Sequence, residues 1–520
     1  MRLQTLVPGW VLLGAVACSA PLKPAAAPAP DLKPRLDAAD QLVRIGCFDC
    51  LTEALREYEA LRAVSAAPAA IVASATAGAV RAAALLDIRE RELGMTDDGY
   101  LQRARDLAAT SEELRTRSAA AFEIVENIPW HVMQYPTTAA GVPTPAAFRE
   151  LQAKRQQQTE ALKARADTDE LASYSWLAFG CANPLSRADG AALLSALTVF
   201  RDAPLVVYRA ATCVRADKQK LTDLVEREPR FVEIAFHLGS IAIGARELDD
   251  AEAHMKRAYD WHPRWPAVTT SLGNLYMSAE EVATALTFYD RTLELAPEHG
   301  EALIGRVRAL SHLGRHDDAF ATIDHVLKET RWFPGETLYW RAWNELQVGR
   351  IEEAWASVGR AEALWAGGQV SKLAGLIALR RKELEVGRGK FELGRRQTPE
   401  DCEMSFLLGS THAELRSWEP TAAVFVETAA CVKSAQNELT RTIARIQASK
   451  ASEERKARLV ARAEQKIRDA ERMLATSWFN TAAAYYNLAK KAEAREYAEK
   501  VSADPQFGER ARDLLSRLEK

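Results

Sequence analysis

The feature that most constrains this chain is a pattern of small and bulky residues that recurs with a period of 34 residues. Four glycines separated by 34 or 102 residues share one position of the repeat: Gly239, Gly273, Gly375 and Gly409. Sixteen residues after this position lies a bulky column: Met255, Tyr289, Ile323, Val358, Phe391 and Phe425. Pro263, Pro297 and Pro399 recur eight residues after members of that column. A fixed period of this size is the signature of stacked repeats.

The alternation of small and bulky columns predicts pairs of closely packed helices. Small side chains let two helices approach each other, and a bulky column fills the space between neighbouring pairs. Each proline ends a helix, and polar or glycine-bearing turns such as Gly314–Asp317 separate the two helices of a pair. The chain has hardly any strand-like runs. We therefore expect an all-α fold, with six stacked units between residues 231 and 433.

The order of these columns resembles the consensus of the tetratricopeptide repeat (TPR) family, including Tyr276 three residues after Gly273. The resemblance implies a TPR-type α-solenoid whose concave wall is formed mainly by the first helix of each pair. Aromatic and polar side chains on such a wall suit extended peptides or protein surfaces. The alternative is that some of them pack between repeats. The resemblance gives these candidate protein-binding residues: Phe236, Asn274, Arg308, Tyr339, Trp343 and Phe406.

The regions around the array carry weaker forms of the same pattern. Residues 36–230 are expected to form a degenerate TPR-like helical region, and residues 477–520 a C-terminal TPR-like pair with a capping helix. Residues 434–476 have heptad-spaced apolar residues and contain no glycine or proline. This segment predicts a projecting antiparallel coiled-coil hairpin with its tip near Ser452. The alternative is one solvated helix that bridges two repeats.

The N-terminus has the layout of a secretory signal. Arg2 precedes an apolar run from Leu6 to Ala17 that is too short to span a membrane. Ala15–Cys18 resembles a bacterial lipobox, although leucine is more usual at the position of Ala15. The resemblance implies a signal peptide at residues 1–17, a lipid on Cys18 and an Ala/Pro-rich tether at residues 18–35. Ser19 suits sorting to the outer membrane, facing the periplasm. An ordinary secretory signal that contains a cysteine is the alternative.

The cysteine count fits an exported protein. Removing a lipidated Cys18 from seven cysteines leaves six, which permit fifteen disulfide connectivities. Cys402 and Cys431 are expected at one end of the same helix pair. Cys47–Cys50 is a C-x-x-C motif, for which a structural pair is favoured over a redox centre because the strand context of such a centre is absent. The candidate disulfide residues are Cys47, Cys50, Cys181, Cys213, Cys402 and Cys431.

The sequence offers little sign of chemistry. A net charge of −3, spread through segments of mixed sign, gives no field to attract nucleic acid. His312 and His316 flank a predicted turn without further metal ligands, and no hydrolase or nucleotide-binding motif is found. We expect no cofactor, no metal and no enzyme activity.

Two functions remain open from the sequence. The first is a membrane-anchored TPR scaffold that binds proteins or peptide segments in the bacterial cell envelope, in assembly, secretion or outer-membrane biogenesis. The second is a solute-binding helical lipoprotein that delivers a small ligand to a transporter, which would require an enclosed pocket. The sequence leaves the oligomeric state open.

Overall fold

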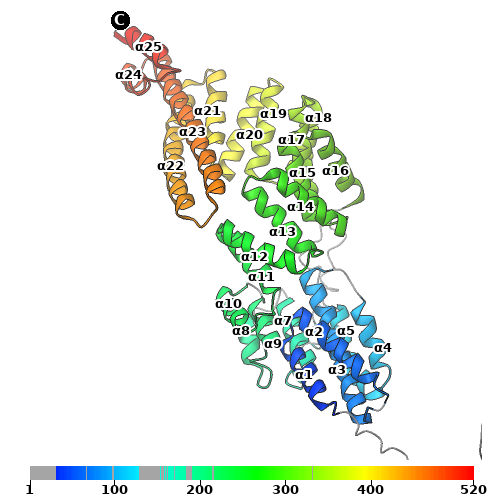
Figure 1. The fold of residues 1–520 in the computed structure, drawn as a ribbon. Helices are drawn as coiled ribbons and strands as arrows, with labels where there is room; N and C mark the ends of the chain where they lie inside the picture. The colour runs from blue at the N-terminus through cyan, green and yellow to red at the C-terminus, as the bar shows by residue number, and fades with distance from the viewer. Residues whose placement is uncertain are drawn as a thin grey trace, which may run out of the picture.

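The computed structural model shows an elongated, all-helical molecule (Figure 1). It describes residues 31–519 except 66, 96–98, 128–152, 154–156, 158–159, 161, 169, 183–189, 214–215 and 331. Every regular element in these ranges is a helix, and none is a strand. The predicted all-α solenoid is therefore confirmed. The signal peptide, the lipidation site Cys18 and most of the tether lie outside the described residues.

The N-terminal helices form a bundle around α3. In this part of the chain the helices are α1 (Lys33–Ile45), α2 (Phe48–Arg62), α3 (Ala69–Leu93), α4 (Tyr100–Ala108), α5 (Glu112–Asn127), α7 (Glu170–Ala182), α8 (Gly190–Ser195), α9 (Pro204–Ala211) and α10 (Lys218–Arg227). α3 packs against α1, α2, α4, α5 and α7. By length and composition α3 is apolar enough to cross a membrane, but 56% of its most apolar window is buried inside the protein. It serves here as the core helix of the bundle.

Six helix pairs follow the bundle and stack into a curved array (Figure 1). They are α11 (Ile234–Ala245) with α12 (Leu248–Trp261), α13 (Pro266–Ser278) with α14 (Val282–Leu295), α15 (Gly300–His312) with α16 (His316–Glu329), α17 (Pro334–Gln347) with α18 (Ile351–Leu364), α19 (Gly368–Arg380) with α20 (Leu384–Gln397), and α21 (Cys402–Glu414) with α22 (Trp418–Ala448). Along most of the array the first helix of a pair also packs against the first helix of the next. The odd-numbered helices therefore line the tighter, inner side of the curve.

The bulky column of the repeat packs as the sequence predicts. The ring of Tyr289 on α14 lies against Gly273 in its own pair and against Gly305 in the next pair. A methyl group added at Gly273 would come within 2.6 Å of that ring. Phe391 lies in the same way over Gly375. Glycine is therefore needed at these positions because an aromatic ring occupies the space of a side chain.

Each pair turns at one residue in the left-handed conformation. Glycine occupies this position at Gly314 (φ 71°) and Gly349 (φ 79°). The equivalent residues of the other pairs are not glycine: Arg246, Glu280, Lys382 and Arg416. A left-handed conformation costs such residues about 1–2 kcal/mol. Glycine would avoid this cost at these four turns.

The segment after the array forms the predicted antiparallel hairpin. α22 extends to Ala448, and α23 (Glu453–Asn487) returns antiparallel to it and packs along it. The turn lies at residues 449–452, where the tip was expected. We call residues 434–476 the arm. α24 (Lys491–Glu499) and α25 (Gly508–Glu519) close the C-terminus.

The arm differs from the expectation of a free projection. Its tip reaches back to the first two helix pairs of the array (Figure 1), where arginines of α23 meet carboxylates of α12 and of the α13–α14 turn. The curvature of the array is the physical reason, because it brings the sixth pair round towards the first.

Candidate functional site

The inner face of the array is the candidate site, and the odd-numbered helices position its side chains. All six predicted wall residues lie on these helices and are half-buried: Phe236 on α11, Asn274 on α13, Arg308 on α15, Tyr339 and Trp343 on α17, and Phe406 on α21. None is fully buried and none is fully exposed. Their role in binding stays a prediction.

Three of the aromatic residues pack against neighbours. The ring of Phe236 lies 4.9 Å from that of Trp265, which belongs to the next pair. Tyr339 and Trp365 meet edge to face at 5.8 Å, as do Phe406 and Phe425. These contacts fit the alternative given by the sequence, in which some of the wall residues pack against their neighbours and stabilise the stack of helix pairs.

Arg308 and Asn274 occupy the same position in successive repeats and meet at Tyr289. The Tyr289 hydroxyl donates a hydrogen bond of 2.7 Å to Oδ1 of Asn274. Burial raises the pKa of Tyr289 to about 12, and the positive charge of Arg308 opposes that rise. Nε of Arg308 is buried and has no hydrogen-bond partner among the described residues. Because this Nε atom is buried, it is not itself exposed to a partner on the wall.

Trp343 lies at the centre of a cluster of aromatic and histidine rings. Its ring is 5.9 Å from that of Trp340, 6.3 Å from that of His312 and 6.1 Å from that of His316. Nδ1 of His316 lies 2.8 Å from Oδ1 of the buried Asn344. The histidines therefore flank the α15–α16 turn, as expected, and also extend the aromatic surface around Trp343.

The arm is fastened to the array by a set of ion pairs that we call the clasp. Arg455 lies 3.1 Å from Asp249 and 3.2 Å from Glu281, and it also pairs with Glu252. Only 12% of the Arg455 side chain is exposed. The remaining clasp contacts are Arg458–Glu281 at 2.8 Å, Arg462–Glu280 at 2.8 Å and Lys466–Glu280 at 3.5 Å.

The clasp depends on carboxylates that stay charged. Burial raises the pKa of Glu252, but hydrogen bonds from Lys256, Arg455 and Tyr276 outweigh it and lower the pKa to about 2. Burial likewise lowers the pKa of Arg455, but hydrogen bonds to Glu252 and Asp249 reverse the effect and raise it overall. Both partners therefore stay ionised through the physiological pH range.

A second ionic cluster joins the N-terminal bundle to the array, and the sequence analysis did not identify it. Arg89 on α3 and Glu233 just before α11 are both fully buried, with 2.8 Å between Nη2 and Oε1. Arg209 pairs with Glu92 at 2.7 Å. Burial raises the pKa of Glu92, yet Arg209 and Arg89 lower it overall. The signal that sequence reasoning missed is the charged run at residues 89–92, at the C-terminal end of a mostly apolar helix.

The six candidate cysteines lie in three pairs at disulfide geometry. The Cα atoms of Cys47 and Cys50 are 4.9 Å apart, those of Cys181 and Cys213 5.0 Å, and those of Cys402 and Cys431 5.6 Å. Cys47 caps α2, and its Sγ accepts a hydrogen bond from the backbone of Cys50. Both residues are fully buried, whereas reactive C-x-x-C cysteines are partly exposed. The structural role preferred for this pair fits its burial.

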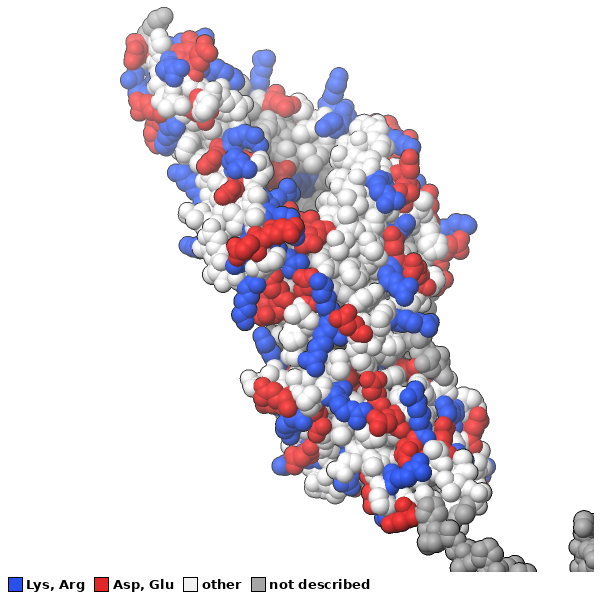
Figure 2. All heavy atoms as spheres, in the orientation of Figure 1, with Lys and Arg blue, Asp and Glu red and all other residues white. Residues whose placement is uncertain are grey.

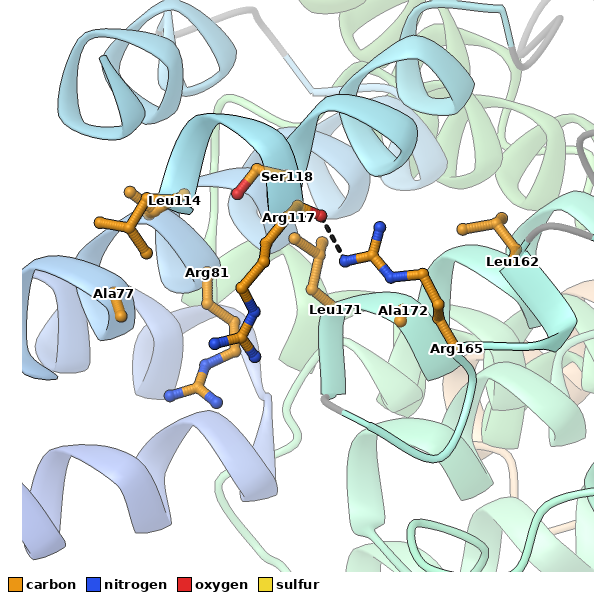
Figure 3. A pocket seen from close by; sticks show the side chains of 10 residues that line it. Ala77, Arg81, Leu114, Arg117, Ser118, Leu162, Arg165, Leu171 and Ala172 are labelled. Atoms are coloured by element: carbon orange, nitrogen blue, oxygen red, sulfur yellow. Dashed lines mark hydrogen bonds between the residues drawn. The ribbon is translucent and has the colours of Figure 1, made fainter. Parts of the chain in front are cut away.

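A separate cavity of about 130 Å³ lies in the N-terminal bundle. Figure 3 shows the side chains of Arg81 and Arg117 extending in the same direction, with their guanidinium groups near each other in this view, and Arg165 donating to the backbone carbonyl of Arg117. Arg81 also pairs with Glu170 at 3.0 Å. Pockets for metabolites usually measure about 300–1,000 Å³, so this cavity is small for an organic solute.

Comparisons with known proteins found likeness only among solved structures. No protein-family model matches the chain, and no curated protein matches it. A repeat protein from Parabacteroides merdae is 16% identical over 50% of this chain and 93% of its own, with a TM-score of 0.36. Pseudomonas aeruginosa PilF is 13% identical over 38% of this chain and 89% of its own, with a TM-score of 0.34. The Cut9–Hcn1 complex gives 14% identity, 94% and 95% coverage and a TM-score of 0.39. Similarity at this level carries no argument about function, and the repeat type rests on the chain's own columns and packing.

Proposed function

We propose that this chain, a tetratricopeptide-repeat protein by its 34-residue columns and its stacked helix pairs, is a scaffold that binds protein partners along its concave wall. Solenoids of this kind present an extended curved surface, which suits protein and peptide ligands. The observation that carries the proposal is the centre of the wall. There the half-buried rings of Trp343 and His316 lie 6.1 Å apart, and the exposed ring of His312 lies 6.3 Å from that of Trp343. Burial lowers the pKa of His312, and the positive charge of the nearby Arg308 adds to this effect. Tryptophan and arginine are among the residues most enriched in binding hot spots.

The finer proposal is that the scaffold is anchored in the bacterial cell envelope through a lipid on Cys18, at the outer membrane and facing the periplasm. Three cysteine pairs at disulfide distance support export, because disulfides persist in oxidising compartments. The lipobox-like sequence before Cys18 supports the anchor. Lipid attachment by more than one acyl chain would give stable membrane binding.

Affinity purification from the envelope fraction of the producing bacterium tests the scaffold. The bait is the full mature chain with Cys18→Ser, so that the lipid does not retain unrelated membrane proteins. We expect specific protein partners that are lost with Arg308→Ala and with Trp343→Ala. The control is Lys328→Ala, which changes an exposed residue on α16. Retention of the same partners by both wall variants would contradict the proposal.

The alternative of a solute-binding lipoprotein makes a different prediction. A metabolite would remain bound to the purified protein in native mass spectrometry, and no protein partner would depend on the wall. The small volume of the arginine-lined cavity disfavours this alternative.

A further inference from the structure

The clasp closes the array on itself. From Asp249 the chain runs through the remaining pairs, enters the arm and returns to Asp249 as an ion pair with Arg455, which is 206 residues away in sequence. Array, arm and clasp together form a ring. Figure 2 shows the molecule hollowed between the arm and the α15–α17 part of the array, with few charged side chains on the array side of the hollow.

The contact that closes the ring is almost entirely ionic. Between residues 449 and 466 the only buried apolar residues are Ala451 and Ala463. α23 does not pack extensively against α12, α13 or α14 in the described part of the chain, and long arginine and lysine side chains make the bridge. The side chains of Arg458, Arg462 and Lys466 are about half exposed, so their ion pairs are individually weak and are screened by salt. The pairs of Arg455 are partly buried and are screened less. Such a contact can open without unfolding the repeats.

Basic residues recur on α23 at the spacing that the clasp needs. Arg455, Arg458, Arg462 and Lys466 lie three or four residues apart, on one face of the helix. Their acidic counterparts lie at the edge of the first two pairs. One of them, Glu280, has a φ of 59° at the turn position where two other pairs have glycine. The match of a basic helix face to an acidic edge makes closure specific to this place.

We propose that the arm is a releasable gate over the concave wall: the clasp holds the ring closed, and a folded protein partner reaches the wall only when the clasp opens. That the partner is a protein rests on the proposed function, whereas the closing of the ring by the clasp does not. Separation of the charges, rather than unfolding, is the step that opens the ring.

Spin-label distances test the closure. The labels are attached to Lys450→Cys at the tip and Ala253→Cys on α12, both at exposed positions, in the full chain with Cys18→Ser. We expect one narrow distance distribution at 0.05 M NaCl. At 1 M NaCl, where the Debye length falls to about 3 Å, the distribution should broaden and lengthen. Arg455→Glu with Arg458→Glu should give the same opening at low salt. Unchanged distances in both cases would overturn the gate.

A matched control and a rescue variant keep this test specific. Arg468→Glu with Arg472→Glu reverses two exposed charges of the same helix that do not reach the array, and it should leave the distances unchanged. Glu281→Arg, added to the Arg455→Glu and Arg458→Glu variant, should restore part of the closed distribution. Circular dichroism should show equal helix content in all variants, because the changed side chains lie on the surface of the arm or at a turn.

Access to the wall tests whether closure covers it. Ser240 is exposed and shares the repeat position of Asn274 and Arg308, and Thr287 is an exposed residue on α14. We expect Ser240→Cys to react with a 5-kDa polyethylene-glycol maleimide several-fold faster when the clasp is broken, relative to small N-ethylmaleimide. Thr287→Cys should react at one rate in both states. An equal rate at Ser240→Cys with the clasp intact and broken would overturn the gate.

The two proposals fail in distinguishable ways. If the ring opens and the wall becomes accessible but no protein partner binds, the scaffold function fails and the gate stands. If wall-dependent partners bind equally well with the clasp intact and broken, the gate fails and the scaffold stands.

Discussion

Arg89 and Glu233 form a fully buried ion pair that joins the N-terminal bundle to the first helix of the array, across 144 residues of sequence. The second Nη of Arg89 contacts Glu92, and the guanidinium lies 4.0 Å above the ring of Tyr208. Oε1 of Glu233 also accepts a hydrogen bond of 2.9 Å from the backbone of Phe48. These contacts fix the orientation of the bundle relative to the array.

Replacing Glu233 by alanine should therefore destabilise the protein strongly. Without Glu233 the two buried arginines, Arg89 and Arg209, share the single carboxylate of Glu92. One buried positive charge is then uncompensated, which costs about 3–5 kcal/mol. Urea unfolding measured by circular dichroism checks the loss. Glu53→Ala is the matched control, because Glu53 pairs with Arg230 near the same junction but is exposed, and its loss should cost at most about 1 kcal/mol. Equal effects of the two substitutions would contradict this account.

His237 should make folding stability depend on pH. Burial lowers its pKa to about 4, with Arg89 and Arg209 adding to the shift and Glu92 opposing it. Above pH 6.5 the histidine is neutral in both the folded and the unfolded state, so its protonation does not reduce the stability of the fold. As the pH falls from 6.5 towards 4 the unfolded chain takes up a proton first, so stability decreases by about 3 kcal/mol.

The measurement is the free energy of unfolding of wild type minus that of His237→Gln, from pH 7.5 to 4.5. The difference should shrink as the pH falls, since only the wild type has this histidine. His325→Gln, at an exposed position on α16, is the matched control. A difference that does not vary with pH would show that His237 is not held neutral by burial.

The repeat columns make a prediction about glycine. Gly273→Ala places a methyl group within 2.6 Å of the Tyr289 ring, and overpacking of this kind costs about 1–3 kcal/mol. Gly359→Ala is the control, because this glycine is exposed on α18 with nothing within 4 Å of an added methyl. That change should stabilise the protein by up to about 1 kcal/mol. In thermal unfolding, the midpoint temperature should fall for Gly273→Ala and rise for Gly359→Ala.

The last disulfide should stabilise the base of the arm. Cys402 opens α21 and Cys431 lies in α22, 29 positions later in the sequence. Closing a loop of this length stabilises the folded state by about 3–4 kcal/mol in the chain-entropy model. The double variant Cys402→Ala with Cys431→Ala should unfold at correspondingly lower urea concentration. An unchanged midpoint would show that the pair does not restrain the unfolded chain.

The sequence was sufficient for the array because its information is local. Gly273 and Tyr289 lie in one repeat, so their spacing alone predicts which helix faces meet, and the packing of Tyr289 confirms it. The hairpin tip near Ser452 was also predictable, since the apolar seam lapses there. The pairing of helices that are neighbours in sequence can be predicted without knowing the overall shape of the molecule.

The clasp and the buried junction could not be predicted, because they depend on the accumulated curvature of many repeats. Arg455 and Asp249 are 206 residues apart, and neither segment has a sequence pattern that predicts contact with the other. The wall was only partly predictable for a similar reason. Helical position places Phe236 on the inner helix, but only the structure shows its ring against Trp265.

Site-specific photocrosslinking tests the central claim, that partners bind along the concave wall, most directly. A photoreactive amino acid is placed in the living bacterium at Ser240 or Arg308 on the inner helices, and at Thr287 or Lys328 on the outer ones. The account predicts crosslinked protein partners from the inner positions and none from the outer ones. Crosslinks from Thr287 and Lys328 alone would contradict it.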